Sequence, residues 1–169
     1  MLTLKFQVSI ARTVLFCFFV IPPVLAETKQ VSGWIEKVAV SDPKLVLPAK
    51  IDTGARNSSI HAGDFKIFSK QGNDWVKFSV SSKDGESRLI ERPVKRFTKI
   101  KQKNNKPSKQ RPVIVLGVCL SNVYKEVEVN LVDRANFNYP MLVGRSFLAG
   151  SFVVDSGEKY LTTPKCNFQ

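Results

Sequence analysis

The sequence predicts a mainly β chain with one short helix. Apolar residues come in short runs, several of which alternate with polar residues as in half-buried strands. The chain has nine glycines and nine prolines, which suits many short elements joined by turns. Turn signals separate the runs, and the clearest is the Asp84-Gly85 pair. We therefore expect strands connected by tight turns within a single domain.

Residues 1–26 are predicted to be a secretory signal peptide. Lys5 and Arg12 precede an apolar run that is shorter than the roughly 20 residues needed to span a bilayer. Val24 and Ala26 occupy the positions that a signal peptidase reads. The alternative is an uncleaved membrane anchor. Cleavage after Ala26 leaves residues 27–169 as one domain, periplasmic or secreted, without a second apolar stretch of membrane length.

The expected elements follow in chain order. Residues 31–40 and 44–51 predict two strands, and the second ends at Asp52. Residues 74–80 and 87–94 flank the turn sequence of residues 81–86 and predict a hairpin. Residues 111–120 and 125–132 predict a second hairpin around residues 121–124. Residues 141–150 contain the one expected helix start, and residues 151–156 and 159–163 predict the last strands.

The charge of the chain is strongly basic. The formal charge of +12 falls to +10 when Lys5 and Arg12 are removed with the signal peptide. Residues 94–111 hold eight lysines or arginines and no acid, which indicates a solvated loop. The loop either keeps the protein soluble, covers a binding cleft, or contacts anionic envelope surfaces. Nucleic acid is not expected as a partner, because the segment lacks interleaved aromatic residues and the protein is predicted to be exported.

Two cysteines, Cys119 and Cys166, remain after removal of the signal peptide. In an oxidising compartment they are able to pair and close a long loop. Two buried thiols are the alternative, and the sequence leaves both open.

The triplet Asp52-Thr53-Gly54 follows an apolar strand and is the main candidate for chemistry. A carboxylate at a tight turn activates a water when a second carboxylate lies beside it, because the two groups share one proton and act as base and acid (the aspartic proteases are the standard example of such a pair). A single Asp52 lacks this partner, so the hypothesis requires a second acid.

A second motif supplies context for Asp52. The order "IDTGA" at residues 51–55 and then "MLVGRSFL" at residues 141–148 resembles the retropepsin-like aspartic proteases. With its flanks, the chain is most similar to a bacterial branch that is often labelled ATP-dependent zinc protease and found near ATP-grasp ligases. The resemblance covers roughly residues 31–164.

The resemblance implies a closed β-barrel subunit and assigns roles to matching positions. Asp52 would be the catalytic acid, with its partner Asp52 of a second copy in a homodimer. Thr53, Gly54 and Ala55 would form the active-site turn, and Gly144 and Arg145 would support it from the helix. The flap over the substrate would be the basic segment with its flanking strands, in competition with the hairpin tip at residues 81–87.

Other residues carry weaker signals. Arg56 stands where retroviral enzymes have an acid that pairs with the helix arginine. We expect no metal and no cofactor, since His61 is the only histidine and no Gly-rich phosphate loop is present. His61 is expected to be a surface or hydrogen-bonded residue near the cleft. Asp155, in the sequence Asp-Ser-Gly, is not expected to be catalytic, because too little chain follows it to build a second lobe.

The function predicted from the sequence is therefore that of an exported aspartic endopeptidase acting on peptide or protein substrates. A non-catalytic module that binds a peptide or an envelope component is the alternative on the same fold. A zinc peptidase ranks third, for want of ligands.

Overall fold

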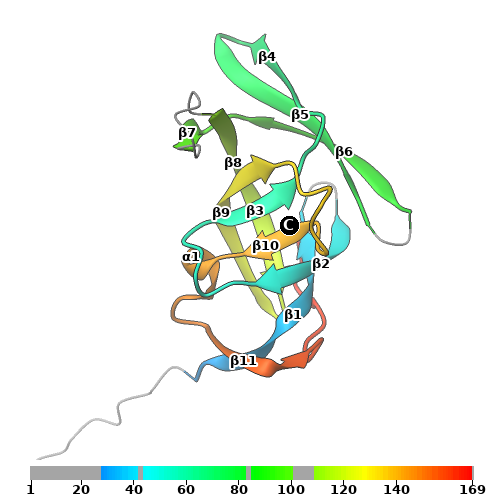
Figure 1. Cartoon of the computed structure of the whole chain (residues 1–169), viewed down its shortest axis with the longest axis vertical. Coiled ribbons are helices and arrows are strands. Elements are labelled where there is room, and N and C mark those ends of the chain that lie inside the picture. The colour runs from blue at the N-terminus through cyan, green and yellow to red at the C-terminus, as the bar shows by residue number, and fades with distance from the viewer. Residues whose placement is uncertain (1–27, 42–43, 83–84, 101–108, 169) are drawn as a thin grey trace, which may run out of the picture.

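The structure is a computed structural model, which describes residues 28–41, 44–82, 85–100 and 109–168. These residues form β-strands and one four-residue helix, α1 (Arg145–Leu148), arranged as one large and one small sheet (Figure 1). The prediction of a mainly β chain with one short helix is confirmed. In the part of the chain that is described, no helix is long and apolar enough to cross a membrane. Residues 1–26, the predicted signal peptide, and the tip of the basic segment lie outside the described residues.

The large sheet has eight strands. In spatial order they are β11 (Phe152–Lys159), β1 (Gln30–Val40), β2 (Leu45–Ile51), β10 (Met141–Val143), β3 (Ser58–His61), β9 (Val123–Val132), β8 (Lys109–Leu120) and β7 (Arg96–Ile100). β1 also pairs with β8 at Ala39–Cys119 and Val40–Val118, so the sheet folds back on itself. β11 and β7 extend beyond this pairing as edge strands, and a fully closed barrel remains a prediction.

The small sheet is a three-stranded antiparallel unit that projects from one end of the large sheet in Figure 1. It consists of β4 (Lys66–Lys70), β5 (Asn73–Ser81) and β6 (Ser87–Pro93). Its Phe78 and Ile90 are buried in the same hydrophobic core as the large sheet. The β5–β6 hairpin was predicted from its turn sequence, whereas β4 was not predicted.

The core is built by alternation along the strands. On β2, Leu45, Leu47, Ala49 and Ile51 are buried, whereas Lys50 points to solvent. Successive side chains of a strand point to opposite faces, so this pattern places one row of apolar side chains inside. The chain leaves the sheet directly after Ile51, which brings Asp52 to the end of the buried row.

The prediction of a strand at residues 159–163 is wrong. β11 runs on to Lys159, and the chain then turns at Tyr160, whose φ of 57° ends the extended conformation. The backbone N–H groups of Leu161 and Thr162 donate to the carboxylate of Glu36 at 3.0 Å, instead of to a neighbouring strand. Glu36 is fully buried in β1. This side chain therefore holds the tail where a strand was expected.

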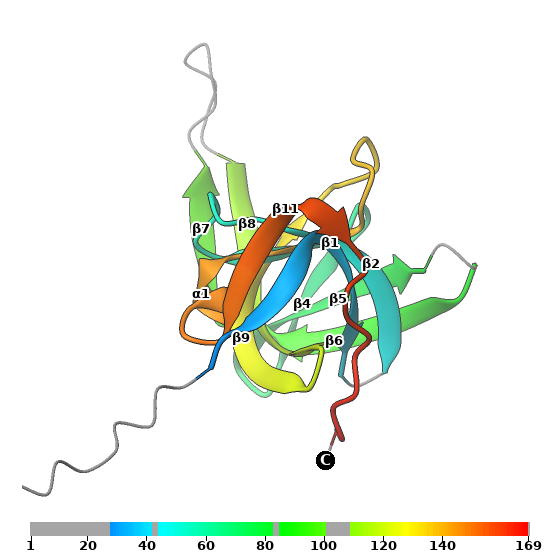
Figure 2. The ribbon, with the colours of Figure 1, turned by 90° about the horizontal axis from the view of Figure 1, so that it is seen from below.

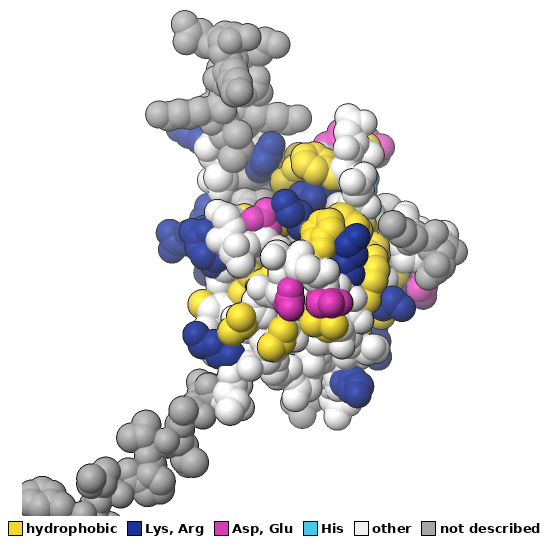
Figure 3. Space-filling model, turned by 60° about the horizontal axis from the view of Figure 1, so that its bottom comes forward, with side chains coloured by type: hydrophobic (Ala, Val, Ile, Leu, Met, Phe, Trp, Pro, Cys, Tyr) yellow, Lys and Arg dark blue, Asp and Glu magenta, His cyan; other side chains and the backbone are white. Residues whose placement is uncertain are grey.

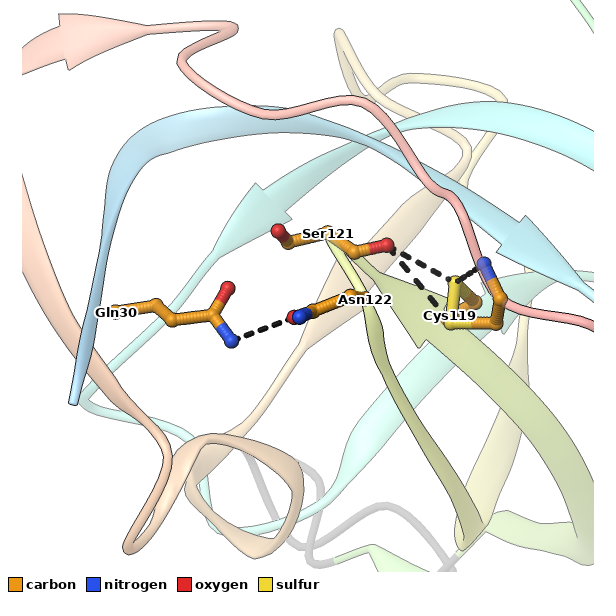
Figure 4. Close-up of a disulfide and its surroundings, with 5 residues drawn as sticks. Gln30, Cys119, Ser121 and Asn122 are labelled. Carbon is orange, nitrogen blue, oxygen red and sulfur yellow. Dashed lines mark hydrogen bonds between the residues drawn. A yellow bond between two sulfur atoms is a disulfide. The ribbon is translucent and has the colours of Figure 1, made fainter. Parts of the chain in front are cut away.

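A disulfide joins Cys119 to Cys166 and settles the alternative that the sequence left open. Figure 4 shows that the disulfide lies beside the β8–β9 turn, where Ser121 presents its carbonyl oxygen to both sulfur atoms. The backbone N–H of Lys165 also donates to Ser121 O, at 2.6 Å. The disulfide and the Glu36 contacts together attach residues 161–166 to the large sheet.

Candidate functional site

Asp52 stands where two strands from distant parts of the sequence run parallel. β2 pairs with β10 from Ala49–Met141 to Ile51–Val143, and the N–H of Asp52 donates to Val143 O at 2.9 Å. Beyond this bond the chain turns away from the sheet. The backbone of Asp52 is therefore fixed by the segment that immediately precedes α1.

The carboxylate of Asp52 is oriented by its own turn. Oδ1 accepts hydrogen bonds from the N–H groups of Gly54, at 2.9 Å, and Ala55, at 3.3 Å. A Cβ at position 54 would lie 3.1 Å from Oδ1, so glycine allows this close approach. Oδ2 lies 3.6 Å from Lys50 Nζ, and 23% of the Asp52 side chain is exposed. One carboxylate oxygen is thus held by the backbone while the group stays accessible.

The Gly-Arg motif lies directly behind this turn, as the sequence predicted. Arg145 Nη1 donates to the carbonyl oxygens of Thr53 and Gly54, both at 2.8 Å. The backbone N–H of Arg145 donates to Ala55 O at 2.9 Å. Arg145 therefore binds backbone carbonyls of the turn. A Cβ on Gly144 would lie 2.7 Å from backbone atoms of Asn57.

Two hollows flank the turn. A cleft of about 460 Å³ extends toward β7 and β8, and its polar lining includes Asn57, Arg96, Thr98, Arg111, Asn130 and Arg134. A smaller hollow of about 210 Å³ lies on the other side and is lined by Thr53, Arg145 and Phe152, among others. Ala55 borders the first and Thr53 the second, so the residues next to Asp52 in the chain reach both hollows.

The two flap candidates differ in what they border. Arg96, Thr98 and Arg111 of the β7–β8 hairpin line the cleft next to the turn. Ser82 and Glu86, from the β5–β6 hairpin, line a separate hollow of about 460 Å³ without a residue of the turn, and Ser82 also lines a hollow of about 200 Å³ that Arg134 borders. Of the two hairpins, the basic one thus contributes residues to the cleft next to the turn, and which hairpin acts as the flap stays a prediction.

Arg134 is a site residue that the sequence prediction missed. Only 7% of it is exposed, and its Nε and Nη1 donate to Tyr139 O, at 3.0 Å, and Ser59 Oγ, at 3.2 Å. Burial lowers the pKa of Arg134 from its ordinary value, and the negative charge of Asp52 opposes that shift. Arg134 also lines the same cleft as Ala55 of the Asp52 turn. The available signal was a charged Asp-Arg pair directly after an alternating strand.

Arg96 anchors the basic hairpin to the sheet. Its Nη2 lies 2.6 Å from Glu128 Oε2 on β9, and its Nη1 donates to Thr98 Oγ1 at 2.6 Å. The hydrogen bond from Arg96 lowers the pKa of Glu128 from its ordinary value. Arg96 is therefore already paired, whereas Arg111 lines the same cleft without a carboxylate partner among the described residues.

Of the remaining sequence candidates, His61 contacts Arg134, whereas Asp155 lies outside this arrangement. His61 Nδ1 accepts a hydrogen bond from the N–H of Arg134 at 2.9 Å. Asp155 is exposed on β11, and its Oδ1 accepts from the N–H of Gly157. Within the described ranges, no group of three or more His, Cys, Asp or Glu side chains is placed to hold a metal ion.

The chain is similar to two kinds of known protein. It is 34% identical over 124 residues to a probable alpha-L-glutamate ligase of Shewanella pealeana, and 32% identical over 123 residues to one of Desulfotalea psychrophila. These matches cover 70% and 68% of the chain but only 27% and 26% of the relatives, so the chain spans about a quarter of their length.

A crystal structure is similar over a larger share of the chain. It is that of a Legionella pneumophila protein of unknown function, with a TM-score of 0.69 and 31% identity, covering 80% of this chain and all of that one. The model of the family described as RimB-like, retropepsin-like aspartic endopeptidase RimB, matches residues 31–165. With Asp52 held in its turn and Arg145 behind it, the chain belongs to the RimB-like family of retropepsin-like aspartic endopeptidases.

Proposed function

We propose that the protein is an aspartic endopeptidase whose active site forms from two copies of the chain. The observation that carries the proposal is the Asp52 turn, in which two backbone N–H groups orient one carboxylate oxygen and Arg145 binds the turn from behind. Each chain supplies one such acid. Two Asp52 carboxylates brought together share a proton, so one accepts a proton from the attacking water and the other protonates the leaving amine.

The dimer is proposed to form across the side of the turn that carries the smaller hollow. Val31 and Val153, on the paired strands β1 and β11, are 53% and 52% exposed. Figure 2 places β11 beside α1, so this edge lies close to the Asp52 turn, and Figure 3 shows exposed hydrophobic side chains between basic ones on one face of the molecule. Such an edge strand is able to pair with another copy of itself.

The peptide is proposed to carry acidic side chains. Three arginines line the cleft, and Arg96, Arg111 and Arg134 face a peptide that enters it. The relatives named alpha-L-glutamate ligase suggest glutamate-containing chains as one class of substrate. An arginine-lined cleft attracts and orients carboxylates.

We also propose that the protein acts outside the cytoplasm, in the periplasm or after secretion. The signal-like pattern of residues 1–26 and the Cys119–Cys166 disulfide support this, because disulfides persist mainly in oxidising compartments. Contact of residues 94–111 with an anionic envelope surface is part of the same proposal.

Cleavage of a mixed peptide library tests the peptidase. Purified residues 27–169 are incubated with the library at acidic and neutral pH, with and without a chelator, beside Asp52→Asn. We expect the unmutated protein to generate new peptide termini, and the chelator to leave their rate of formation unchanged. Asp52→Asn should lower that rate at least about a thousandfold. Chelator-sensitive cleavage would instead indicate a zinc peptidase.

A non-catalytic peptide-binding module is the second candidate. The observation that favours it is the proximity of Lys50 Nζ to Asp52 Oδ2, at 3.6 Å, which gives the acid an intramolecular partner. Peptide binding without cleavage, equal in the unmutated protein and Asp52→Asn, would decide for this candidate.

A further inference from the structure

We propose that Arg134 binds a carboxylate of the peptide in the cleft beside Asp52. This rests on the proposed function only in that a peptide occupies the cleft. The carboxylate belongs either to an acidic side chain or to the C-terminus of the peptide, since both present the same two oxygens. Arg134 is thus a specificity-determining residue of the site.

The first argument is that no carboxylate forms an ion pair with the charge of Arg134 among the described residues. Only 7% of the residue is exposed, and its hydrogen-bond acceptors, Tyr139 O and Ser59 Oγ, are neutral. Among the described residues, no carboxylate lies within ion-pair distance of its guanidinium. A buried cation without a counter-charge is costly to the fold. An anion arriving in the cleft would supply that counter-charge.

The neighbouring Asp133 is not this counter-charge. Its Oδ1 accepts a hydrogen bond from the N–H of Ala135 at 3.0 Å and lies 3.8 Å from His61 Nδ1. More than half of its side chain is exposed, at 62%. Asp133 therefore caps its own turn, and the nearby acid whose charge acts on Arg134 is Asp52.

The second argument is the fixed position of the guanidinium. Tyr139 O and Ser59 Oγ hold Nε and Nη1, and the Phe137 ring lies 4.5 Å from Cζ. These contacts use two of the three guanidinium nitrogens, so the Nη2 edge remains for a ligand. A planar guanidinium that is already oriented loses little entropy when it binds a carboxylate. Arg134 lines the cleft and also a neighbouring hollow of about 200 Å³, and we place the ligand on the cleft side, where Arg111 adds a second positive charge.

The third argument is the surroundings of Arg134 in the cleft. Arg96 is occupied by Glu128, whereas Arg111 and the amide of Asn57 line the same cleft and complete a polar, cationic wall. Ala55 of the Asp52 turn lines the same cleft and places this wall beside the proposed reacting acid. The carboxylate that is recognised therefore lies close in the peptide to the bond that is cut.

Binding to an inactive protein tests the proposal. The probes are four fluorescent peptides, with glutamate or glutamine side chains and with a free or amidated C-terminus, titrated into Asp52→Asn so that none is cut. We expect Asp52→Asn to bind one carboxylate-bearing class of peptide, either the glutamate peptides or those with a free C-terminus, more tightly than its neutral counterpart. Arg134→Gln in the same background should reduce that preference about 10- to 100-fold, and the affected class identifies the source of the carboxylate.

Two further variants separate recognition from folding. Arg134→Lys keeps a cation and should retain part of the preference, and Arg88→Gln, on the exposed face of β6, should retain all of it. If Arg134→Gln does not fold, the Nε–H resonance of Arg134 in the unmutated protein is followed by NMR. Glutarate should shift this resonance and glutaramide should not.

The outcomes are distinct. Absence of a carboxylate preference in Asp52→Asn, an unchanged preference in Arg134→Gln, or equal shifts with glutarate and glutaramide overturns the proposal. A preference that depends on Arg134, in a protein that cleaves no peptide, supports the subsite and removes the peptidase assignment. Peptide cleavage that does not depend on Arg134 supports the peptidase assignment and overturns the subsite.

Discussion

Gly144 shows how a single missing side chain sets the geometry of the site. Its N–H donates to the buried Ser58 Oγ at 3.1 Å, and a Cβ in its place would lie 2.7 Å from the backbone carbonyl of Asn57. The close approach of these two segments keeps Arg145 within reach of the carbonyls of Thr53 and Gly54.

Gly144→Ala should therefore affect both stability and activity. The added methyl group meets backbone rather than a flexible side chain, so we expect a loss of about 1–3 kcal/mol in the free energy of unfolding. Urea unfolding measures this loss, and peptide cleavage should fall as the turn is displaced. Gly63→Ala is the matched control, because its Cβ would first meet the His61 side chain, at 3.4 Å. Equal unfolding midpoints for the two variants would contradict this account.

The residue scale also shows what the sequence was unable to predict. Asp52 and Arg145 were proposed as site residues because each lies in a short motif, and the structure places Arg145 against the Asp52 turn. Arg134 was missed because an arginine is usually exposed, and its burial depends on Ser59, Tyr139 and Phe137 in three dimensions. Only the fold reveals that Arg134 lines the same cleft as Ala55 of the Asp52 turn.

At the scale of elements, local patterns predicted the strands that alternate and the hairpins with clear turns. β5–β6 and β8–β9 both form as expected. β3 was not predicted because it has four residues and buries two serines, Ser58 and Ser59, in place of apolar side chains. The tail after Lys159 was assigned wrongly because Glu36, which binds it, lies more than 120 residues earlier.

Glu36 provides a prediction for the tail. Its carboxylate accepts hydrogen bonds from Gly33, Leu161 and Thr162 and is fully buried. Glu36→Gln replaces an acceptor oxygen by an NH₂ group that faces N–H donors. We expect a loss of about 1–3 kcal/mol in the free energy of unfolding and faster proteolysis of residues 161–166.

Urea unfolding and limited proteolysis test this, with Glu126→Gln on the exposed side of β9 as the control. The role assigned to Glu36 would be refuted by a variant whose tail resists protease as well as that of the control.

At the scale of the whole molecule, the proposed dimer depends on the edge formed by β1 and β11. Val153→Lys places a charge on this exposed edge, and charged side chains on edge strands oppose pairing. We expect the dimer dissociation constant to rise by about tenfold or more, and peptidase activity per chain to fall at low concentration and recover at high concentration.

Light scattering and cleavage rates over a range of protein concentration measure both effects. Leu89→Lys is the control, because Leu89 is similarly exposed, at 55%, but lies on β6 of the small sheet. An equal effect of both substitutions would place the dimer contact elsewhere.

The pairing of β2 with β10 has a consequence for the order in which the protein matures. The bond from Asp52 N–H to Val143 O joins segments about 90 residues apart, and β1 pairs with β11 over an even longer separation. High contact order slows folding, because distant segments must meet before their contacts form. While residues 141–148 are still inside the ribosome, Val143 and Arg145 are not available to hold the Asp52 turn. For the proposed peptidase, hydrolytic competence is therefore not expected before residues 141–148 have left the ribosome and paired with the Asp52 turn.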